Sequence, residues 1–143
     1  MNRTKRVIEK DTVVTATLLE TRYGAIIDAV NQLSGPEVAW DPLRNCYGLR
    51  ARQAYRPGEV ITTYGGRRSL TPIRGDYVAR CSELHIDGRT DFRLSEKGRW
   101  INESCRDRLI VNATLGRQVR ALTPIQAGEW IFVDYGEEYQ RSY

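Results

Sequence analysis

A group of chemically capable side chains follows an apolar pair in the stretch GRWINESC, residues 98–105. An amide, a carboxylate, a hydroxyl and a thiol stand in succession at Asn102, Glu103, Ser104 and Cys105. Such a concentration of polar and reactive groups directly behind a tryptophan and an isoleucine raises the question of a functional site. The stretch is equally compatible with an ordinary strand end, because Asn and Ser favour turns and a free cysteine packs like a small apolar residue. Taken alone, it leaves both interpretations open.

Two other stretches of the chain repeat one pattern of turn and strand residues. Residues 58–66 read GEVITTYGG and residues 128–137 read GEWIFVDYGE. In each, a Gly-Glu pair typical of a turn leads into a short strand-like run that ends on Tyr-Gly. Two copies are too few for a repeat protein, so we predict one β-rich domain that contains two similar hairpin arms.

The residues that precede these arms have a helical pattern. Between Thr12 and Leu33 the apolar residues recur mostly at three- and four-residue steps, which predicts a helix in one or two pieces around Gly24. The helix should end at residues 34–36, Ser-Gly-Pro, because glycine and proline terminate helices. We therefore predict an N-terminal helical extension over residues 1–40, packed on a domain that spans residues 41–143.

Beyond Trp40 the sequence favours short strands separated by turn residues. We expect strands or hairpin arms at residues 60–64, 83–87, 109–114, 118–122 and 130–135. Asp87-Gly88 is a hairpin signal, and a short helix is expected around residues 77–80. The predicted fold class is α+β and mostly β.

Size and composition are those of one globular domain. The chain has 143 residues, of which 41% are hydrophobic and 28% charged, and this length is enough to bury roughly two thirds of the extended-chain surface. No apolar run approaches the ~20 residues of a membrane span, and residues 1–10 lack the hydrophobic centre of a secretory signal. We therefore expect an intracellular protein of the nucleus or cytoplasm, without membrane contact.

Cysteine and charge content bear on the kinds of site to expect. The three cysteines are odd in number and widely spaced, which argues against a disulfide framework and a CxxC-type zinc site, so no metal is expected. The 22 Lys and Arg residues exceed the 18 Asp and Glu residues and give a net charge of +4. This balance is compatible with contact to nucleic-acid phosphate and equally with an ordinary solvated surface.

Four short motifs follow one another along the chain. They are Tyr47-Gly48-Leu49-Arg50-Ala51 before a Pro-Gly-Glu turn, Tyr64-Gly65-Gly66 after it, RWINESC at residues 99–105, and Gly128-Glu129 leading to Asp134-Tyr135-Gly136. In this order the chain resembles the SET-domain family of protein lysine methyltransferases, whose members carry a GxGLxA stretch, a PGE turn followed by YxG, an RFxNHSC motif and a final DYG. The resemblance spans about residues 45–139. It implies a SET-domain, β-clip-like fold with a knot-like threading of the C-terminal strand.

The resemblance also implies a cofactor and residues that hold it. Members of the family transfer a methyl group from S-adenosyl-L-methionine. By this resemblance Asn102 would bind the cofactor through its side-chain amide, and Glu103 mainly through backbone groups. The remaining residues expected to bind the cofactor are Tyr47, Gly48, Leu49 and Trp100.

A catalytic tyrosine and a lysine channel follow from the same resemblance. Tyr135 matches the family's active-site tyrosine, and because a phenol has a pKa near 10 we expect it to orient and stabilise the reacting groups instead of taking a proton. Tyr64, Val133 and Tyr139 would line the channel, where the ring of Tyr139 would attract the substrate ammonium. The expected partner is a protein with a target lysine, and a histone is one candidate.

Three departures from the family pattern leave alternatives open. Cys46 replaces the first glycine of the GxG motif, Glu103 replaces a histidine, and Arg106-Asp107-Arg108 replaces Asp-Pro-Asn, so that a role for Asn112 in place of the lost asparagine is an open question. A catalytically inactive SET-like protein-interaction module is therefore the second hypothesis. Because no cysteine-rich zinc segment follows Tyr135, the N-terminal helix, the terminal segment or a second copy of the chain (a homodimer) would have to close the channel, unless the chain is a fragment.

Overall fold

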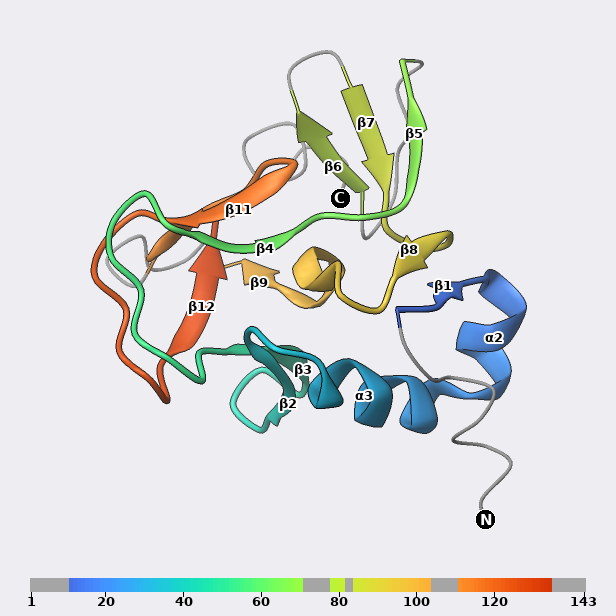
Figure 1. The fold of residues 1–143 in the computed structure, drawn as a ribbon, viewed down its shortest axis with the longest axis horizontal. Coiled ribbons are helices and arrows are strands. Elements are labelled where there is room, and N and C mark those ends of the chain that lie inside the picture. Colours follow the sequence, from blue (N-terminus) through green and yellow to red (C-terminus); the bar gives the residue numbers. More distant parts are fainter. Residues whose placement is uncertain (1–10, 71–77, 82–83, 104–110, 135–143) are drawn as a thin grey trace.

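The computed structural model describes residues 11–70, 78–81, 84–103 and 111–134 of the chain (Figure 1). In these ranges short strands predominate, which confirms the expected α+β, mostly β fold. The strands are β1 (Val13–Val14), β2 (Glu37–Asp41), β3 (Cys46–Arg50), β4 (Val60–Thr63), β5 (Arg67–Ser69), β6 (Val78–Cys81), β7 (Leu84–Asp87), β8 (Phe92–Arg93), β9 (Asn102–Glu103), β10 (Ala113–Thr114), β11 (Gln118–Ala121) and β12 (Trp130–Val133). The helices are α2 (Ala16–Thr21), α3 (Tyr23–Gln32) and the 3₁₀ helix η1 (Lys97–Trp100). None of these helices has the length and apolar character needed to cross a membrane.

The helical pattern near the N-terminus divides into two helices at Arg22, close to the expected break at Gly24. Thr15 caps α2, because its Oγ1 accepts a hydrogen bond from the backbone N–H of Leu18 at 3.2 Å. Arg22 has a φ of −134° and separates the two helices. The helical prediction is wrong at β1, which pairs with β8 instead, since two β-branched valines fit a strand better than a helix.

The strands form four small sheets within the described ranges. Their strand orders are β1-β8, β10-β11-β4, β2-β3-β12-β9 and β5-β7-β6. The described pairs are antiparallel except for β12 and β9, which run parallel. Parallel neighbours cannot be joined by a tight turn, so this pair brings together segments that are well separated along the chain.

Two local predictions in the middle of the chain are wrong. The short helix expected around residues 77–80 is absent from the described residues 78–80, which belong to β6 and pair with β7, so tertiary pairing outweighs a weak helical pattern. The Asp87-Gly88 turn does not close a hairpin with the next strand, because β7 pairs with β5 and β6. The Asp87 carboxylate instead binds Arg89, whose side-chain hydrogen bonds hold the pKa of Asp87 below its usual value against the effect of burial.

The strands predicted after the two Gly-Glu turns are confirmed as β4 and β12, but neither pairs within its own stretch: β4 pairs with β11, and β12 pairs with β3 and β9. We call residues 51–64 the first arm and residues 121–134 the second arm. The turns of the two arms exchange backbone hydrogen bonds reciprocally: Gly128 N–H donates to Ala51 O at 2.8 Å, and Gly58 N–H donates to Ala121 O at 2.8 Å. Midway between them, Tyr55 and Ile125 form an antiparallel bridge. The two copies of the sequence pattern therefore form one pseudo-symmetric unit.

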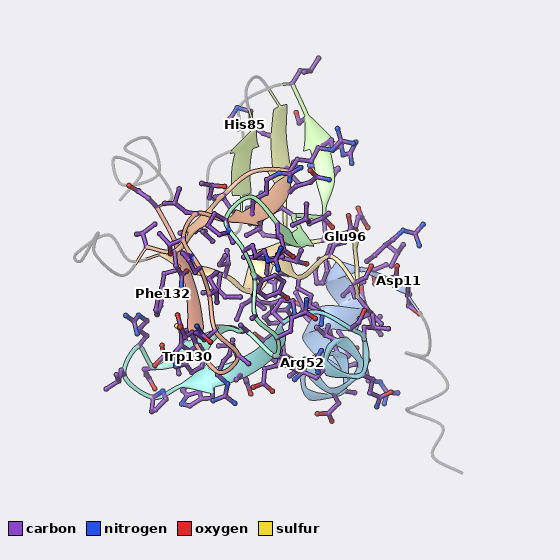
Figure 2. The ribbon with its side chains drawn as sticks, turned by 60° about the vertical axis from the view of Figure 1, so that its left-hand side comes forward. Asp11, Arg52, His85, Glu96, Trp130 and Phe132 are labelled. Carbon is purple, nitrogen blue, oxygen red and sulfur yellow. The ribbon has the colours of Figure 1, made fainter. Side chains whose placement is uncertain are left out.

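Strand β12 of the second arm has an outer face and a core face. Trp130 and Phe132 project from the same side of this strand (Figure 2). The guanidinium carbon of Arg44 lies 4.1 Å from the ring centroid of Phe132, and that of Arg50 lies 5.4 Å from the ring of Trp130. Because side chains alternate along a strand, the intervening residues face the core.

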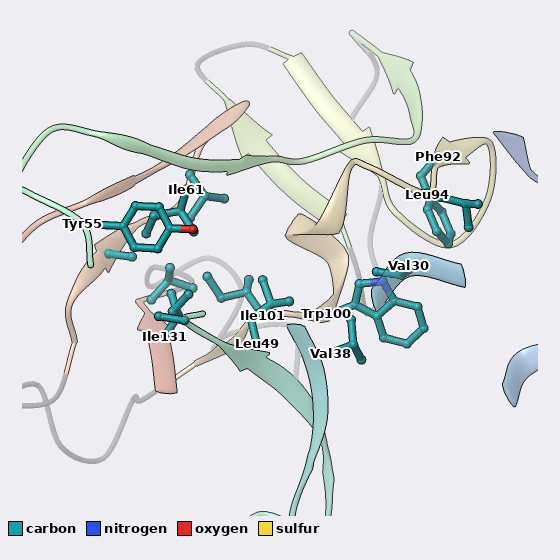
Figure 3. Close-up of a cluster of buried hydrophobic side chains, with 14 of the residues drawn as sticks. Val30, Val38, Leu49, Tyr55, Ile61, Phe92, Leu94, Trp100, Ile101 and Ile131 are labelled. Atoms are coloured by element: carbon teal, nitrogen blue, oxygen red, sulfur yellow. The ribbon is translucent and has the colours of Figure 1, made fainter. Parts of the chain in front are cut away.

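The main hydrophobic core is shared by the helices, the arms and the central sheet (Figure 3). Helix α3 contributes three buried residues, and the strands and η1 supply most of the rest. The largest fully buried apolar side chains of this core include Phe92, Ile26, Leu49, Leu94, Ile125 and Ile131. Because α3 packs into this core, its residues help to support the central sheet; a domain division at residue 40 stays a prediction. The knot-like threading also stays a prediction, since the C-terminal segment lies outside the described residues.

Candidate functional site

The central sheet brings three of the four sequence motifs side by side. Strand β12 pairs antiparallel with β3, where Ile131 stands opposite Leu49. The same strand pairs parallel with β9, where Phe132 stands beside Asn102 and Val133 beside Glu103. Two stretches about thirty positions apart in the sequence are therefore in direct backbone contact, as the cofactor-site hypothesis requires.

The catalytic residue expected from the sequence follows strand β12 in the chain. Tyr135 and Tyr139 are outside the described residues, and their assignments stay predictions. The last described residue, Asp134, directly precedes Tyr135 and follows β12. The strand that precedes Tyr135 in the chain is thus paired with the Asn102-Glu103 motif.

Several residues expected in the site have side chains in the core. Leu49 and Val133 are fully buried, and Trp100 is 4% exposed. Tyr64, at the end of β4, is buried in a second, smaller cluster with Ile86. Gly48 is buried between Tyr47 and Leu49 on β3. At Leu49 and Val133 a ligand would therefore meet backbone more readily than side chain, and the assigned roles of all these residues stay predictions.

A row of aromatic rings leads from the surface to the buried motif. The ring centroid of Trp40 lies 5.1 Å from Tyr47, Tyr47 lies 5.9 Å from Tyr23, and Tyr23 lies 5.6 Å from Trp100. Phe92 continues the row at 6.5 Å from Trp100. Trp40 and Tyr23 are 49% and 39% exposed. Neither residue was predicted to lie near the site. Their only signal in the sequence is their aromatic type, because the contacts depend on β2 pairing with β3 and on α3 packing beside them.

The segment that leads into Asn102 is held at its start by the first arm. The hydroxyl of Thr62 donates to the carbonyl of Ser95 at 3.3 Å and accepts from the backbone N–H of Lys97 at 3.1 Å. Gly98 lies so close to Tyr64 that an added Cβ would stand 2.8 Å from the Tyr64 Cα. Only glycine fits that approach without displacing backbone.

A buried lysine anchors the same segment to the end of α3. The ammonium of Lys97 donates to Pro36 O at 2.6 Å and to Leu33 O at 3.2 Å, and the side chain is fully buried. Burial disfavours the charged form and, with the nearby charge of Arg52, lowers the pKa of Lys97 from its usual 10.5 to about 8. The Arg52 guanidinium also donates to carbonyls at and after the end of α3, including Asn31 O and Gly35 O. Two cations therefore satisfy the carbonyls at the C-terminal end of α3.

The buried guanidinium of Arg99 fixes the next turn of η1. Its Nε donates to Gly88 O at 2.7 Å. The guanidinium carbon lies 4.4 Å from the ring of Trp100 and 5.1 Å from the ring of Phe92. These contacts hold the first residues of the RWINESC motif against the core.

Asn112 binds the backbone of β12 at two residues. Its Nδ2 donates to Trp130 O at 2.9 Å, and its Oδ1 accepts from the N–H of Phe132 at 2.9 Å. Its backbone N–H donates to Phe132 O at 3.1 Å, and its carbonyl accepts from Leu122 N–H at 2.8 Å. The sequence raised Asn112 only as an open question, and the structure gives it a backbone-bridging role.

The surroundings of Trp100 fit the cofactor that the sequence resemblance implies. The indole Nε1 of Trp100 is buried and has no hydrogen-bond acceptor among the described atoms, although a buried donor normally has one. Half-exposed rings of Tyr23 and Trp40 lie along the same row. S-adenosylmethionine has acceptor atoms that could bind the Trp100 N–H. Its planar base and cationic sulfur could each pack against an aromatic ring. In the part of the chain that the structure describes, no group of three or more His, Cys, Asp or Glu side chains could hold a metal ion.

Comparisons with solved structures agree with this arrangement. KRYPTONITE in complex with mCHG DNA and SAH is 21% identical, with a TM-score of 0.55, over 75% of this chain and 25% of that chain. KRYPTONITE with mCHH DNA, an H3(1-15) peptide and SAH is 20% identical, with a TM-score of 0.55, over 77% and 25%. A candidate histone methyltransferase of Plasmodium falciparum is 16% identical, with a TM-score of 0.52, over 76% of this chain and 98% of that chain. At such identities the likeness shows the fold alone.

The chain spans only a quarter of the length of KRYPTONITE. No curated protein sequence matches it. A protein-family model described as SET domain, however, matches residues 3–136. Since this model covers nearly the whole chain and the central sheet brings the family's motifs together, the chain belongs to the SET-domain family.

Proposed function

We propose that the chain is an S-adenosylmethionine-dependent protein lysine N-methyltransferase, with histone lysines as the first substrates to test. The observation that carries the proposal is the parallel pairing of β9 with β12, which sets Asn102-Glu103 against the strand that leads to Tyr135. Membership of the SET-domain family supports it. So do the similar structures, two of which contain SAH and one an H3 peptide.

Three groups of residues would hold the cofactor. The proposed contacts are backbone groups of Tyr47, Gly48 and Leu49 on β3, the Trp100 indole, and Asn102 with Glu103 on β9. When bound, the cofactor supplies a methyl group already activated by the sulfonium. The protein therefore has mainly to align the reacting atoms and exclude water.

The substrate lysine must lose a proton before its nitrogen can attack. Its reference pKa is ~10.4, and an apolar channel beside a cation lowers that value. Tyr64 and Val133, both buried, and Tyr139 are the proposed channel residues. The hydroxyl of Tyr135 would orient the lysine nitrogen toward the methyl group, which is an electrostatic and positioning role.

The first experiment measures methyl transfer from labelled cofactor to a panel of histones. Wild-type chain should label at least one histone, and Tyr135→Phe should abolish labelling while the circular-dichroism spectrum is unchanged, because a single hydroxyl is removed. Asn102→Ala should weaken cofactor binding measured by calorimetry. Wild-type turnover in Tyr135→Phe would refute the catalytic assignment.

Calorimetry also separates this proposal from that of an inactive SET-like interaction module. Such a module need not bind S-adenosylmethionine, so an absence of binding would favour it. A homodimer gains no support from the comparisons, and contact with nucleic acid and a location in the nucleus or cytoplasm stay predictions.

A further inference from the structure

Two asparagine side chains bind backbone groups of the central sheet through the same kind of hydrogen bonds. Asn112 bridges Trp130 O and Phe132 N–H on β12, each at 2.9 Å. Asn31, on α3, bridges the carbonyl and N–H of Val38 on β2 at 2.8 and 2.7 Å. Each amide thus imitates one residue of a neighbouring strand, donating once and accepting once.

The two strands bound by these asparagines, β2 and β12, have different neighbours. In the sheet order β2-β3-β12-β9, β2 stands at one edge and pairs only with β3 among the described strands. Strand β12 pairs with both β3 and β9, and its residue bound by the Asn112 amide, Phe132, is the register partner of Asn102. Asn31 therefore binds a strand at the edge of the sheet. Asn112 binds the strand that pairs with the proposed cofactor motif on β9.

The direction of the hydrogen bonds determines what Asn112 can control. It takes backbone groups of Trp130 and Phe132, including Phe132 O from its own N–H at 3.1 Å. Backbone groups alternate in direction along a strand, so those of Ile131 and Val133 are left for the neighbouring strands. Asn112 thereby binds β12 through backbone groups of Trp130 and Phe132, and it leaves those of Ile131 and Val133 for pairing with β3 and β9.

We propose that Asn112 is a positioning residue of the methyltransferase site, which sets the register and distance of β12 relative to β9. The inference rests on the proposed function for its effect on catalysis. It does not rest on that function for its effect on β9.

Asn31 provides a matched control for testing this role. We compare Asn112→Ala and Asn112→Asp with Asn31→Ala and Asn31→Asp, because each pair removes the same amide from the same sheet. Urea unfolding should show similar destabilisation for the two alanine variants. The kcat of Asn112→Ala should fall about tenfold or more, since small misplacements of reacting groups carry large rate penalties, while Asn31→Ala should stay within about twofold of wild type. Asn112→Asp, which keeps the acceptor and loses the donor, should recover part of the lost kcat.

Backbone-amide NMR provides a measurement that does not depend on activity. The signals of Asn102 and Glu103 should move in Asn112→Ala and stay in place in Asn31→Ala. Unmoved β9 signals, or equal losses of kcat in the two alanine variants, would overturn the positioning role. If the wild-type chain methylates nothing, the proposed function fails, and the NMR comparison still decides whether Asn112 controls β9.

Discussion

The first arm and the second arm begin with the same turn and end in different surroundings. Gly58 and Gly128 have φ angles of 87° and 92°, a left-handed conformation that favours glycine. The carboxylate after each glycine closes the turn: Glu59 accepts from Arg56 N–H at 2.9 Å and Glu129 from Gln126 N–H at 3.2 Å. A Gly-Glu turn is therefore a self-contained local unit that works equally at both places.

The arms diverge four residues after each glycine. In the first arm, Thr62 uses its hydroxyl to bind the backbone at Ser95 and Lys97. In the second arm, Phe132 turns its side chain toward Arg44 and leaves its backbone to Asn112. The first arm therefore fixes the start of the motif segment, and the second arm pairs with its end. A repeated local unit therefore acquires its role from its long-range neighbours.

The largest effect should come from removing the hydroxyl that distinguishes the first arm. Thr62→Val keeps the shape of the side chain and leaves the N–H of Lys97 buried without its acceptor. We expect a loss of about 2 kcal/mol in the free energy of unfolding, measured with urea. Thr63→Val, at a half-buried neighbour, is the control and should change stability by less than about 0.5 kcal/mol. Equal losses for the two variants would contradict the proposed anchoring.

Changing the pH should act on the same anchor through the protonation of Lys97. The pKa of Lys97 is lowered to about 8 in the folded chain, so between about pH 8 and 10.5 the unfolded chain binds the extra proton. Stability should therefore rise with pH over this window, because the folded state no longer carries a buried charge. Lys97→Met should lack this contribution, and the measurement is the difference between wild-type and variant unfolding free energies across the window. A difference that does not depend on pH would show that burial does not lower the pKa of Lys97.

The turns should respond equally to substitution. A Cβ added at Gly58 or Gly128 meets no atom within 4 Å, so the cost comes from the left-handed backbone alone. Gly58→Ala and Gly128→Ala should each destabilise by about 1 kcal/mol in thermal or urea unfolding. Values that differ by more than the experimental error would mean that the two turns are not equivalent.

The smallest effect is expected where the arms meet. Tyr55 and its bridge partner Ile125 are both buried, but the Tyr55 hydroxyl has no hydrogen-bond partner among the described atoms, and burial raises its pKa. Tyr55→Phe makes this position as apolar as Ile125, and the free energy of unfolding should stay level or rise by up to about 1 kcal/mol. A clear loss of stability would reveal a partner for the hydroxyl.

Sequence patterns predicted the features that depend on a few consecutive residues. The Gly-Glu turns, the strands after them and the end of α3 before Gly35 follow from local backbone preferences and hydrogen bonds. The order of the short motifs was also sufficient to indicate the family that the family model then showed. Predictions failed at β1 and β6, where pairing with a distant strand outweighed a weak local pattern.

The features that bring these elements together at the candidate site depend on long-range pairing and packing. Only the folded chain places β9 beside β12, stacks Tyr23 and Trp40 along the row that reaches Trp100, and buries Lys97 under the end of α3. Neither the partner of a strand nor the burial of a side chain is encoded in neighbouring residues, because both arise when many distant segments compete for the same core. The residue types of the motifs could therefore be recognised from the sequence alone. Which motifs lie side by side depends on how the strands pair in the folded sheet.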